Sequence, residues 1–158
     1  MRSIQELLDT YGESHINKTN KAIHWVCVPA IFFSLVGLFY AIPIPASLTK
    51  SIWLNAASVI LVLALLYYLM LSKSMTIGFL FWSAFCLWGN NLIYTYAEQS
   101  NARLAWISLA IFAIAWVFQF IGHKIEGKKP SFLEDIQFLL IGPAWLMSFI
   151  YKKLGLRY

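Results

Sequence analysis

The sequence contains few charged residues. Asp, Glu, Lys and Arg make up 12% of its 158 residues, about half of the roughly 25% that is typical of soluble domains. Hydrophobic residues make up 60%, and the mean hydropathy is +0.68. This balance excludes an ordinary soluble protein and predicts an integral membrane protein. Linker-like and low-complexity stretches are also absent, so we expect a single domain over residues 1–158.

Cysteine is scarce as well. Cys27 and Cys86 both lie within apolar runs, and no CxxC or Cys–His spacing occurs. Neither a disulfide framework nor a cysteine-based zinc site is therefore expected, and both side chains should pack as small hydrophobic groups. The first 24 residues lack the pattern of a cleavable signal peptide. We therefore expect the first apolar run to remain as a membrane anchor.

Long apolar runs are what the sequence has in abundance. Four of them approach the ~20 residues that a membrane-spanning helix needs, and they are Trp25–Ile42, Ile52–Leu71, Met75–Tyr96 and Leu104–Gly122. A fifth run, Phe138–Tyr151, is shorter and contains Gly142-Pro143, which predicts a kinked interfacial or re-entrant helix. Asn90-Asn91, late in the third run, are expected to bond to neighbouring helices, with a polar pocket as the alternative.

A short amphipathic helix precedes the apolar runs. Ser3 is a plausible cap for residues 3–14, and Leu7, Leu8 and Tyr11 form one apolar stripe. Such a helix could lie on the membrane surface. The predicted fold class is therefore all-α integral membrane, with four transmembrane helices, this N-terminal helix and the short C-terminal helix.

The basic residues indicate an orientation. With four spans, ten of the twelve Lys and Arg residues lie on one side of the membrane, together with both termini. The excess of positive charge predicts that this side is cytoplasmic. We expect a bacterial inner membrane, or the endoplasmic reticulum membrane if the chain is eukaryotic. The basic residues form no stripe, so a nucleic acid partner is not expected, whereas acidic lipid headgroups are a plausible partner for the net charge of +5.

The three histidines all lie at the ends of apolar runs. His15 and His24 precede the first run and His123 follows the fourth, which places all three at the same membrane face. Three imidazoles gathered there are a candidate metal site, and simple interfacial packing is the alternative. On one continuous helix, residues nine apart point to opposite sides, so His15 and His24 can meet only if the chain bends within Ile16–Asn20.

A hydrogen-bonding residue stands four positions before each histidine. These residues are Tyr11, Asn20 and Gln119. On a helix such pairs share a face, and a metal-bound histidine usually has its second nitrogen held by such a partner.

An acidic residue follows the last histidine by three positions. Glu126 is a candidate for the same site if the helix continues, and a solvated charge among neighbouring lysines is the alternative. Lys18, Lys21 and Lys128, with Lys129, could attract a substrate carboxylate, although surface lysines often have no such role.

Two blocks of sequence carry a family resemblance. The first is Y-x3-H-x4-N-x3-H-x4-P, from Tyr11 through His15, Asn20 and His24 to Pro29. The second is W-x2-Q-x2-G-H-x2-E-x3-P, formed by Trp116, Gln119, Gly122, His123, Glu126 and Pro130. In this order and spacing the chain, from about residue 7 to its end, resembles the Mpo-type 2-hydroxy fatty acid dioxygenases, small multi-span membrane proteins of fatty acid α-oxidation.

The resemblance implies a function. It implies an Fe(2+) cofactor held by His15, His24 and His123 and an α-oxidation in which a long-chain 2-hydroxy fatty acid and O2 give CO2 and a fatty acid one carbon shorter. Fungal members carry a second histidine where this chain has Ile16, and they have one more residue between the last histidine and the acidic residue. The alternatives are a non-catalytic membrane protein that binds lipid or a partner and a zinc-dependent membrane hydrolase. Chain-length preference and oligomeric state are not encoded in any visible pattern.

Overall fold

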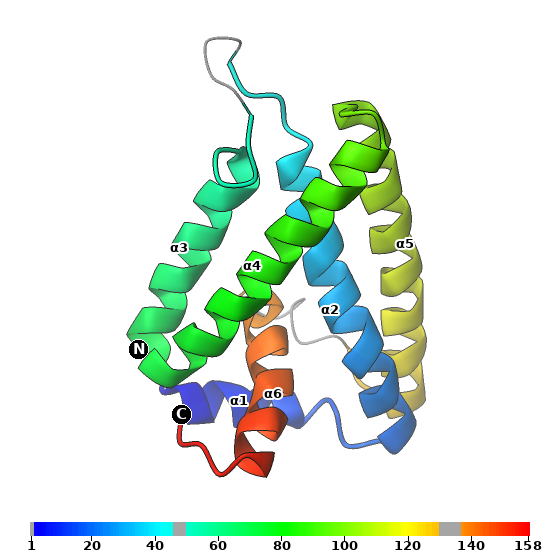
Figure 1. Cartoon of the computed structure of the whole chain (residues 1–158). Coiled ribbons are helices and arrows are strands. Elements are labelled where there is room, and N and C mark those ends of the chain that lie inside the picture. The colour runs from blue at the N-terminus through cyan, green and yellow to red at the C-terminus, as the bar shows by residue number, and fades with distance from the viewer. Residues whose placement is uncertain (1, 46–49, 130–136) are drawn as a thin grey trace.

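The computed structural model describes residues 2–45, 50–129 and 137–158, and these residues form six helices and no strands. They are α1 (Ile4–Gly12), α2 (Lys18–Tyr40), α3 (Ala56–Leu71), α4 (Lys73–Tyr96), α5 (Asn101–Glu126) and α6 (Phe138–Lys153) (Figure 1). The all-α prediction is confirmed. Pro130 of the second sequence block lies outside the described residues.

The helices begin at polar caps rather than at the first apolar residue. Ser3 accepts a hydrogen bond from the amide of Glu6 in a capping box, as the sequence predicts for α1. Asn17 caps α2 through its side-chain oxygen, so α2 starts seven residues before the predicted start at Trp25. Asn55 caps α3 in the same way, four residues later than the run predicts. Hydropathy locates the lipid-facing part of a helix, whereas the cap decides where the helix begins.

Among the residues that the structure describes, three helices are long and apolar enough to cross a membrane, namely α2, α4 and α5. The fourth predicted span corresponds to α3, which is apolar but has only 16 residues. The chain therefore carries the features of a membrane-associated protein, and the count of four spans stays a prediction.

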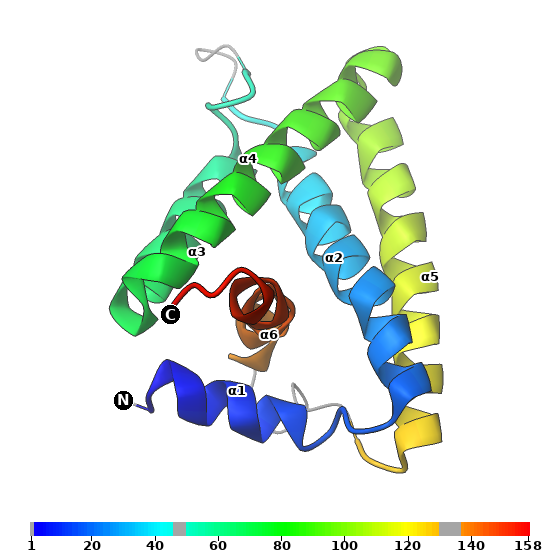
Figure 2. The same cartoon turned by 60° about the horizontal axis from the view of Figure 1, so that its bottom comes forward.

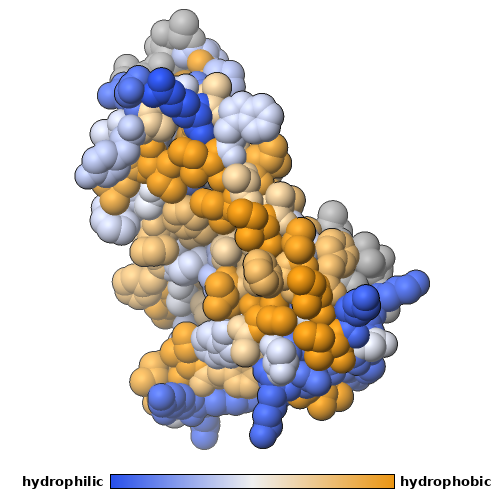
Figure 3. Space-filling view, turned by 90° about the vertical axis from the view of Figure 1, so that its right-hand side faces the viewer, coloured by the Kyte–Doolittle hydropathy of each residue, from blue (hydrophilic) through white to orange (hydrophobic). Residues whose placement is uncertain are grey.

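The long helices alternate in direction, and α2 packs against α5 along its length. Both termini and α1 lie at one end of the bundle (Figure 1). The segments that join α2 to α3 and α4 to α5 meet at the other end, where Lys50 donates a hydrogen bond to the side chain of Asn101. The outer face of α5 is hydrophobic, with exposed side chains such as Trp106, Val117 and Phe118. Figure 3 shows this hydrophobic area between hydrophilic residues at the two ends.

Asparagines join the long helices, as the sequence predicts. The buried Asn90 on α4 donates to the carbonyl of Phe33 on α2, and Tyr40 on α2 donates to the side chain of Asn91. Gly37 lets this contact form, because a Cβ there would clash with Asn90 and with Ser108 of α5. Polar side chains inside an apolar bundle are expected to find such partners, and here they join α2 to α4.

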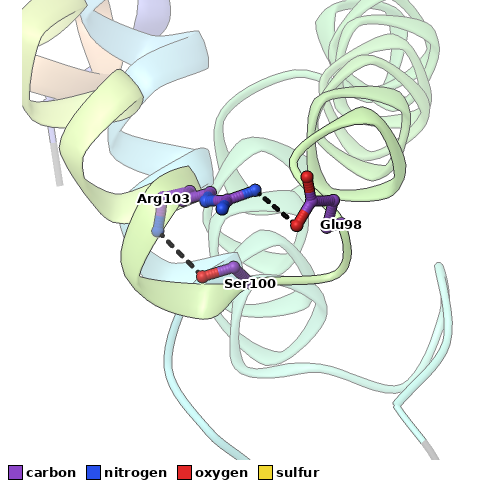
Figure 4. A network of polar contacts seen from close by, with 3 residues as sticks. All are labelled: Glu98, Ser100 and Arg103. Carbon is purple, nitrogen blue, oxygen red and sulfur yellow. Dashed lines mark hydrogen bonds and ion pairs between the residues drawn. The ribbon is translucent and has the colours of Figure 1, made fainter.

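The connection between α4 and α5 is tight. Glu98 and Gln99 both adopt positive φ angles, 57° and 56°, which side chains other than glycine rarely adopt. Ser100 then caps α5 through the amide of Arg103, and the Arg103 guanidinium pairs with Glu98 at 2.7 Å (Figure 4). Both charged side chains are largely exposed, so the ion pair contributes little to stability.

Helices α1 and α6 close the lower half of the bundle. Figure 2 looks along α6, which lies between α1, α2 and the pair α3–α4. The apolar stripe of α1, including Leu7 and Tyr11, packs on α6 rather than on a membrane surface. Residues 141–146 are all buried, so this part of α6 packs against protein. Its interfacial location remains an expectation from the sequence. The re-entrant alternative stays a prediction.

Candidate metal centre

Three histidines from different segments converge at the lower end of the bundle. His15 lies between α1 and α2, His24 lies on α2, and His123 lies in the last turn of α5. Their exposed fractions are 1%, 0% and 4%. The ring centroids lie 4.2 to 5.1 Å apart, and one ring nitrogen from each residue lies within 4.8 Å of the others. The chain bends between the end of α1 and Asn17, which is how His15 and His24 meet.

Main-chain carbonyls fix two of the rings. The Nδ1 of His15 lies 2.6 Å from the carbonyl oxygen of Tyr11, and the Nδ1 of His24 lies 2.9 Å from that of Asn20. A carbonyl can only accept, so Nδ1 carries the proton in both rings and Nε2 presents a lone pair. The residues predicted four positions earlier are therefore the partners, but through their backbone oxygens rather than their side chains. Gln119 makes no such bond, and its buried side-chain oxygen has no hydrogen-bond partner among the described residues.

The free Nε2 atoms meet in the interior. His24 Nε2 and His123 Nε2 lie 3.2 Å apart, and the buried Nε2 of His15 has no hydrogen-bond partner among the described residues. Nitrogens bound to one metal ion, at about 2.0–2.1 Å each, lie at most about 4.2 Å apart. The observed nitrogens, all within 4.8 Å of one another, lie close to this limit. Three imidazoles suit iron, zinc, copper or nickel, so the donor set fits a transition metal without selecting one.

Burial keeps the imidazole of His15 in its neutral form. Desolvation, together with the neighbouring His24, lowers the pKa of His15 to about 3. His15 is therefore neutral at physiological pH, which is the state in which an imidazole binds metal. Tyr11 stacks on the His15 ring with a centroid distance of 4.2 Å. Burial raises the pKa of its phenol above the usual value, so Tyr11 keeps its proton.

Glu126 holds the bend that carries His15. One carboxylate oxygen accepts from the amide of Ile16 at 2.9 Å, and the other accepts from the amide of Asn17 at 2.9 Å and from the side-chain amide of Asn20 at 3.0 Å. These bonds show how Glu126 is placed beside the histidines, and its role in the site stays a prediction. A bend exposes amides without helical partners, and the carboxylate at the end of α5 satisfies them.

A glycine permits the close contact of α2 and α5 beside the site. A Cβ on Gly122 would clash with the side-chain oxygen of Asn20. Asn20 is completely buried, and it also donates to the carbonyl of Ser14. Asn20 therefore links α2, the bend and the end of α5. The missing side chain of Gly122 leaves room for the Asn20 side chain.

The predicted lysines surround the site without entering it. Lys18 and Lys128 are exposed and Lys21 is half-buried. Lys128 donates to the carbonyl of Glu13 at 2.8 Å, so it also ties the end of α5 to the end of α1.

Trp145 on α6 was not predicted from the sequence. Its ring lies 5.0 Å from that of His15 and 5.4 Å from that of Tyr11. It follows Gly142-Pro143 in the last apolar run, and no periodicity in the chain relates it to α1. Only the packing of α6 on α1 brings these rings together.

A small cavity adjoins His123. It has a volume of about 40 Å³ and lies between α1, α2, α5 and α6. His123, Gln119 and Tyr11 provide its polar wall, and the other lining side chains are apolar. The site thus combines a buried imidazole cluster with a space just large enough for a small polar group.

Comparisons with known proteins show the family of this chain. The chain is 27% identical to the 2-hydroxy-palmitic acid dioxygenase MPO1 of Saccharomyces cerevisiae over 154 residues, which cover 96% of this chain and 82% of the yeast protein. None of the solved structures matches the chain. Residues 1–154 match the family described as 2-hydroxy-palmitic acid dioxygenase Mpo1-like. Because this match spans nearly the whole chain, including all three histidines, the protein belongs to the Mpo1-like family.

Proposed function

We propose that this protein is an iron(II)-dependent dioxygenase that converts long-chain 2-hydroxy fatty acids into fatty acids one carbon shorter. The observation that carries the proposal is the convergence of three buried imidazoles beside a cavity inside an apolar helical bundle. The yeast relative is named as a 2-hydroxy-palmitic acid dioxygenase. An enzyme of the oxidoreductase type, acting on a lipid, is consistent with both.

The reaction balances without a further reactant. One 2-hydroxy acid and one O2 give the shortened acid, one CO2 and one water. The two carbons that react lose four electrons in total, and O2 takes up four. The site therefore needs no reductant and no second cofactor, which fits a cavity that accommodates only a small group.

In this proposal, different residues bind the metal, exclude water and position the histidines. His15, His24 and His123 would hold the iron through their Nε2 atoms. Bound iron(II) would supply open coordination positions at which a 2-hydroxy acid and O2 can be brought together. Tyr11 and Trp145 cover His15 and exclude water from it. Glu126 and Asn20 keep the bend in place, so that His15 stays opposite the other two rings.

A substrate with a long acyl chain suits a site at the end of an apolar bundle. An acyl chain can stay in the apolar bundle while the acid head reaches the histidines at its end. Lys18, Lys21 and Lys128 lie around that end and would draw a carboxylate or an anionic headgroup toward it, each by about 1 kcal/mol or less. The charge distribution supports an orientation with this end cytoplasmic, in a bacterial inner membrane or in the endoplasmic reticulum.

Metal loading tests the function. The protein is purified without chelator, loaded with iron(II) anaerobically, and exposed to 2-hydroxypalmitic acid with and without O2. We expect about one equivalent of iron and O2-dependent release of CO2 and a C15 acid. Less than a tenth of an equivalent of iron, with no shortened product, rejects the proposal. The imidazole set also suits zinc, and zinc-dependent, O2-independent hydrolysis would point to a membrane hydrolase instead.

A further inference from the structure

A large apolar groove lies between α2, α4 and α6. Its volume is about 540 Å³, within the roughly 300–1,000 Å³ of typical ligand sites. Its lining is apolar apart from Tyr151, whose hydroxyl donates to the carbonyl of Ser74 and accepts from the amide of Gly78. Apolar atoms therefore make up almost all of the exposed lining of the groove, as suits a hydrocarbon.

The cavity beside the histidines is too small for a long chain. Its volume of about 40 Å³ is less than a tenth of the groove volume, and it is about the size that one or two water molecules occupy. A 2-hydroxy acid could place its head there, but its tail must lie elsewhere.

One layer of small side chains separates the cavity from the groove. Val28 lines both spaces. On α6, Gly142 lines the cavity and the next residue, Pro143, lines the groove. A Cβ on Gly142 would come within 3.2 Å of Val28 and 3.1 Å of the Tyr11 hydroxyl, so the glycine keeps this partition thin.

Two prolines weaken the helices at this partition. Pro29 on α2 and Pro143 on α6 both line the groove. Each removes one backbone hydrogen bond from its helix. A small displacement of the partition therefore breaks fewer backbone hydrogen bonds than it would in two regular helices.

The groove leads away from the histidines. Trp25, which follows His24 in the chain, lines one part of it. Phe85 lines another part and packs beside Phe33, with ring centroids 6.3 Å apart. Phe33 lies nine residues after His24 on α2, about 13 Å along the helix axis. Trp25, Phe81 and Phe85 are 43%, 72% and 49% exposed, so this groove opens at the lipid-facing surface of the bundle.

We propose that the acyl chain of the 2-hydroxy acid lies in this groove, with its head passing between Val28 and Gly142 to the histidines. The substrate then enters sideways from the bilayer, and Phe85 limits the chain length. This inference rests on the proposed function for the identity of the substrate. It adds the place of the tail, the route of entry and the residue that selects chain length.

Photo-crosslinking of metal-free protein tests the placement. The probe is 2-hydroxypalmitic acid with a diazirine at the ω carbon, and labelled peptides are mapped by mass spectrometry. We expect labels on the groove residues of α4 and α6, such as Trp82 and Met147, and their loss in excess unlabelled 2-hydroxypalmitic acid. Labels confined to α3 or the outer face of α5, or labels that do not compete, overturn the inference.

Matched variants sharpen the test. Val28→Phe fills the partition, whereas Val26→Phe makes the same change at a position that is 70% exposed on the same helix. We expect competable labelling to fall at least tenfold in the first and to stay within twofold in the second. Equal labelling in the two variants overturns the inference.

A second pair covers the case in which Val28→Phe fails to fold. Phe85→Ala opens the end of the groove, and Phe118→Ala removes an equally exposed ring (51%) from α5. We expect only Phe85→Ala to shift binding toward C20 over C16 2-hydroxy acids, by about threefold or more. No difference between the two variants overturns the inference. Binding is measured without metal, so the two proposals can fail separately. Labelling of the groove without O2-dependent turnover supports the acyl site and rejects the dioxygenase. Turnover without labelling of the groove supports the dioxygenase and rejects the acyl site.

Discussion

His24 and His123 turn their Nε2 atoms toward each other at 3.2 Å, although 99 positions separate them in the chain. The Nδ1 of His24 already donates to a carbonyl, so its Nε2 can only accept. Without metal, His123 must therefore donate its Nε2 proton to His24. A cation between the two nitrogens replaces that proton, so metal binding should release or relocate it.

Loss of any one histidine should abolish the site. We expect His15→Ala, His24→Ala and His123→Ala each to reduce iron affinity by more than the roughly 10- to 100-fold typical of losing a supporting hydrogen bond, and to abolish turnover. Iron content and product formation measure both effects. A non-catalytic protein with merely interfacial histidines would show three mild and independent effects instead. Retained iron stoichiometry and activity in any one variant would remove that histidine from the site.

Glu126→Gln should weaken metal binding without removing a ligand. The amide keeps one acceptor oxygen and adds a donor that faces the amides of Ile16 and Asn17 and the side chain of Asn20. We expect about one equivalent of iron to bind, with affinity lower by about 10- to 100-fold, and the free energy of unfolding to fall by about 1–3 kcal/mol. The control is Glu98→Gln, where the exposed ion pair predicts a change of about 1 kcal/mol or less. Loss of iron stoichiometry in Glu126→Gln would instead make Glu126 a ligand.

Gly122→Ala should displace Asn20. The added Cβ clashes with the Asn20 side-chain oxygen, and Asn20 is buried between α2 and α5. We expect a loss of about 1–3 kcal/mol in stability and weaker iron binding. Gly12→Ala is the control, because its Cβ would lie at an ordinary 3.5 Å from Trp145. Thermal unfolding in detergent and iron titration measure both variants, and equal effects would argue against a special role for Gly122.

Asn90→Ala should loosen the bundle far from the histidines. Asn90 donates to the carbonyls of Phe33 and Cys86. Because such bonds contribute about 0.6 kcal/mol on average in membrane bundles, and at most about 1.7, we expect a loss of about 1 kcal/mol in unfolding free energy, with iron affinity unchanged. Thr95→Ala is the control, since its hydroxyl makes an exposed bond within its own helix. A loss of iron binding in Asn90→Ala would show that the two ends of the bundle are coupled.

The local chemistry of the chain predicts much of the fold. Ser3 with Glu6 predicts α1, and the first four apolar runs predict α2, α3, α4 and α5, because caps and periodicity act between residues close in sequence. The exact starts of α2 and α3 were missed, since Asn17 and Asn55 decide them rather than hydropathy. The burial of α6 was missed for a different reason. A run that is apolar on all sides indicates burial equally in lipid or in protein, and the sequence does not distinguish the two.

Some features of the candidate site can likewise be predicted from the sequence, and others depend on the tertiary structure. By itself the sequence determined which residues can bind metal and that His15, His24 and His123 share one end of the bundle, because span number and chain direction fix the ends of helices. Only the tertiary structure decided that their Nε2 atoms meet, that Glu126 secures the bend, and that Trp145 packs beside His15. These relationships depend on how the helices rotate and pack against one another, and that packing joins side chains about a hundred positions apart, beyond the reach of any local pattern.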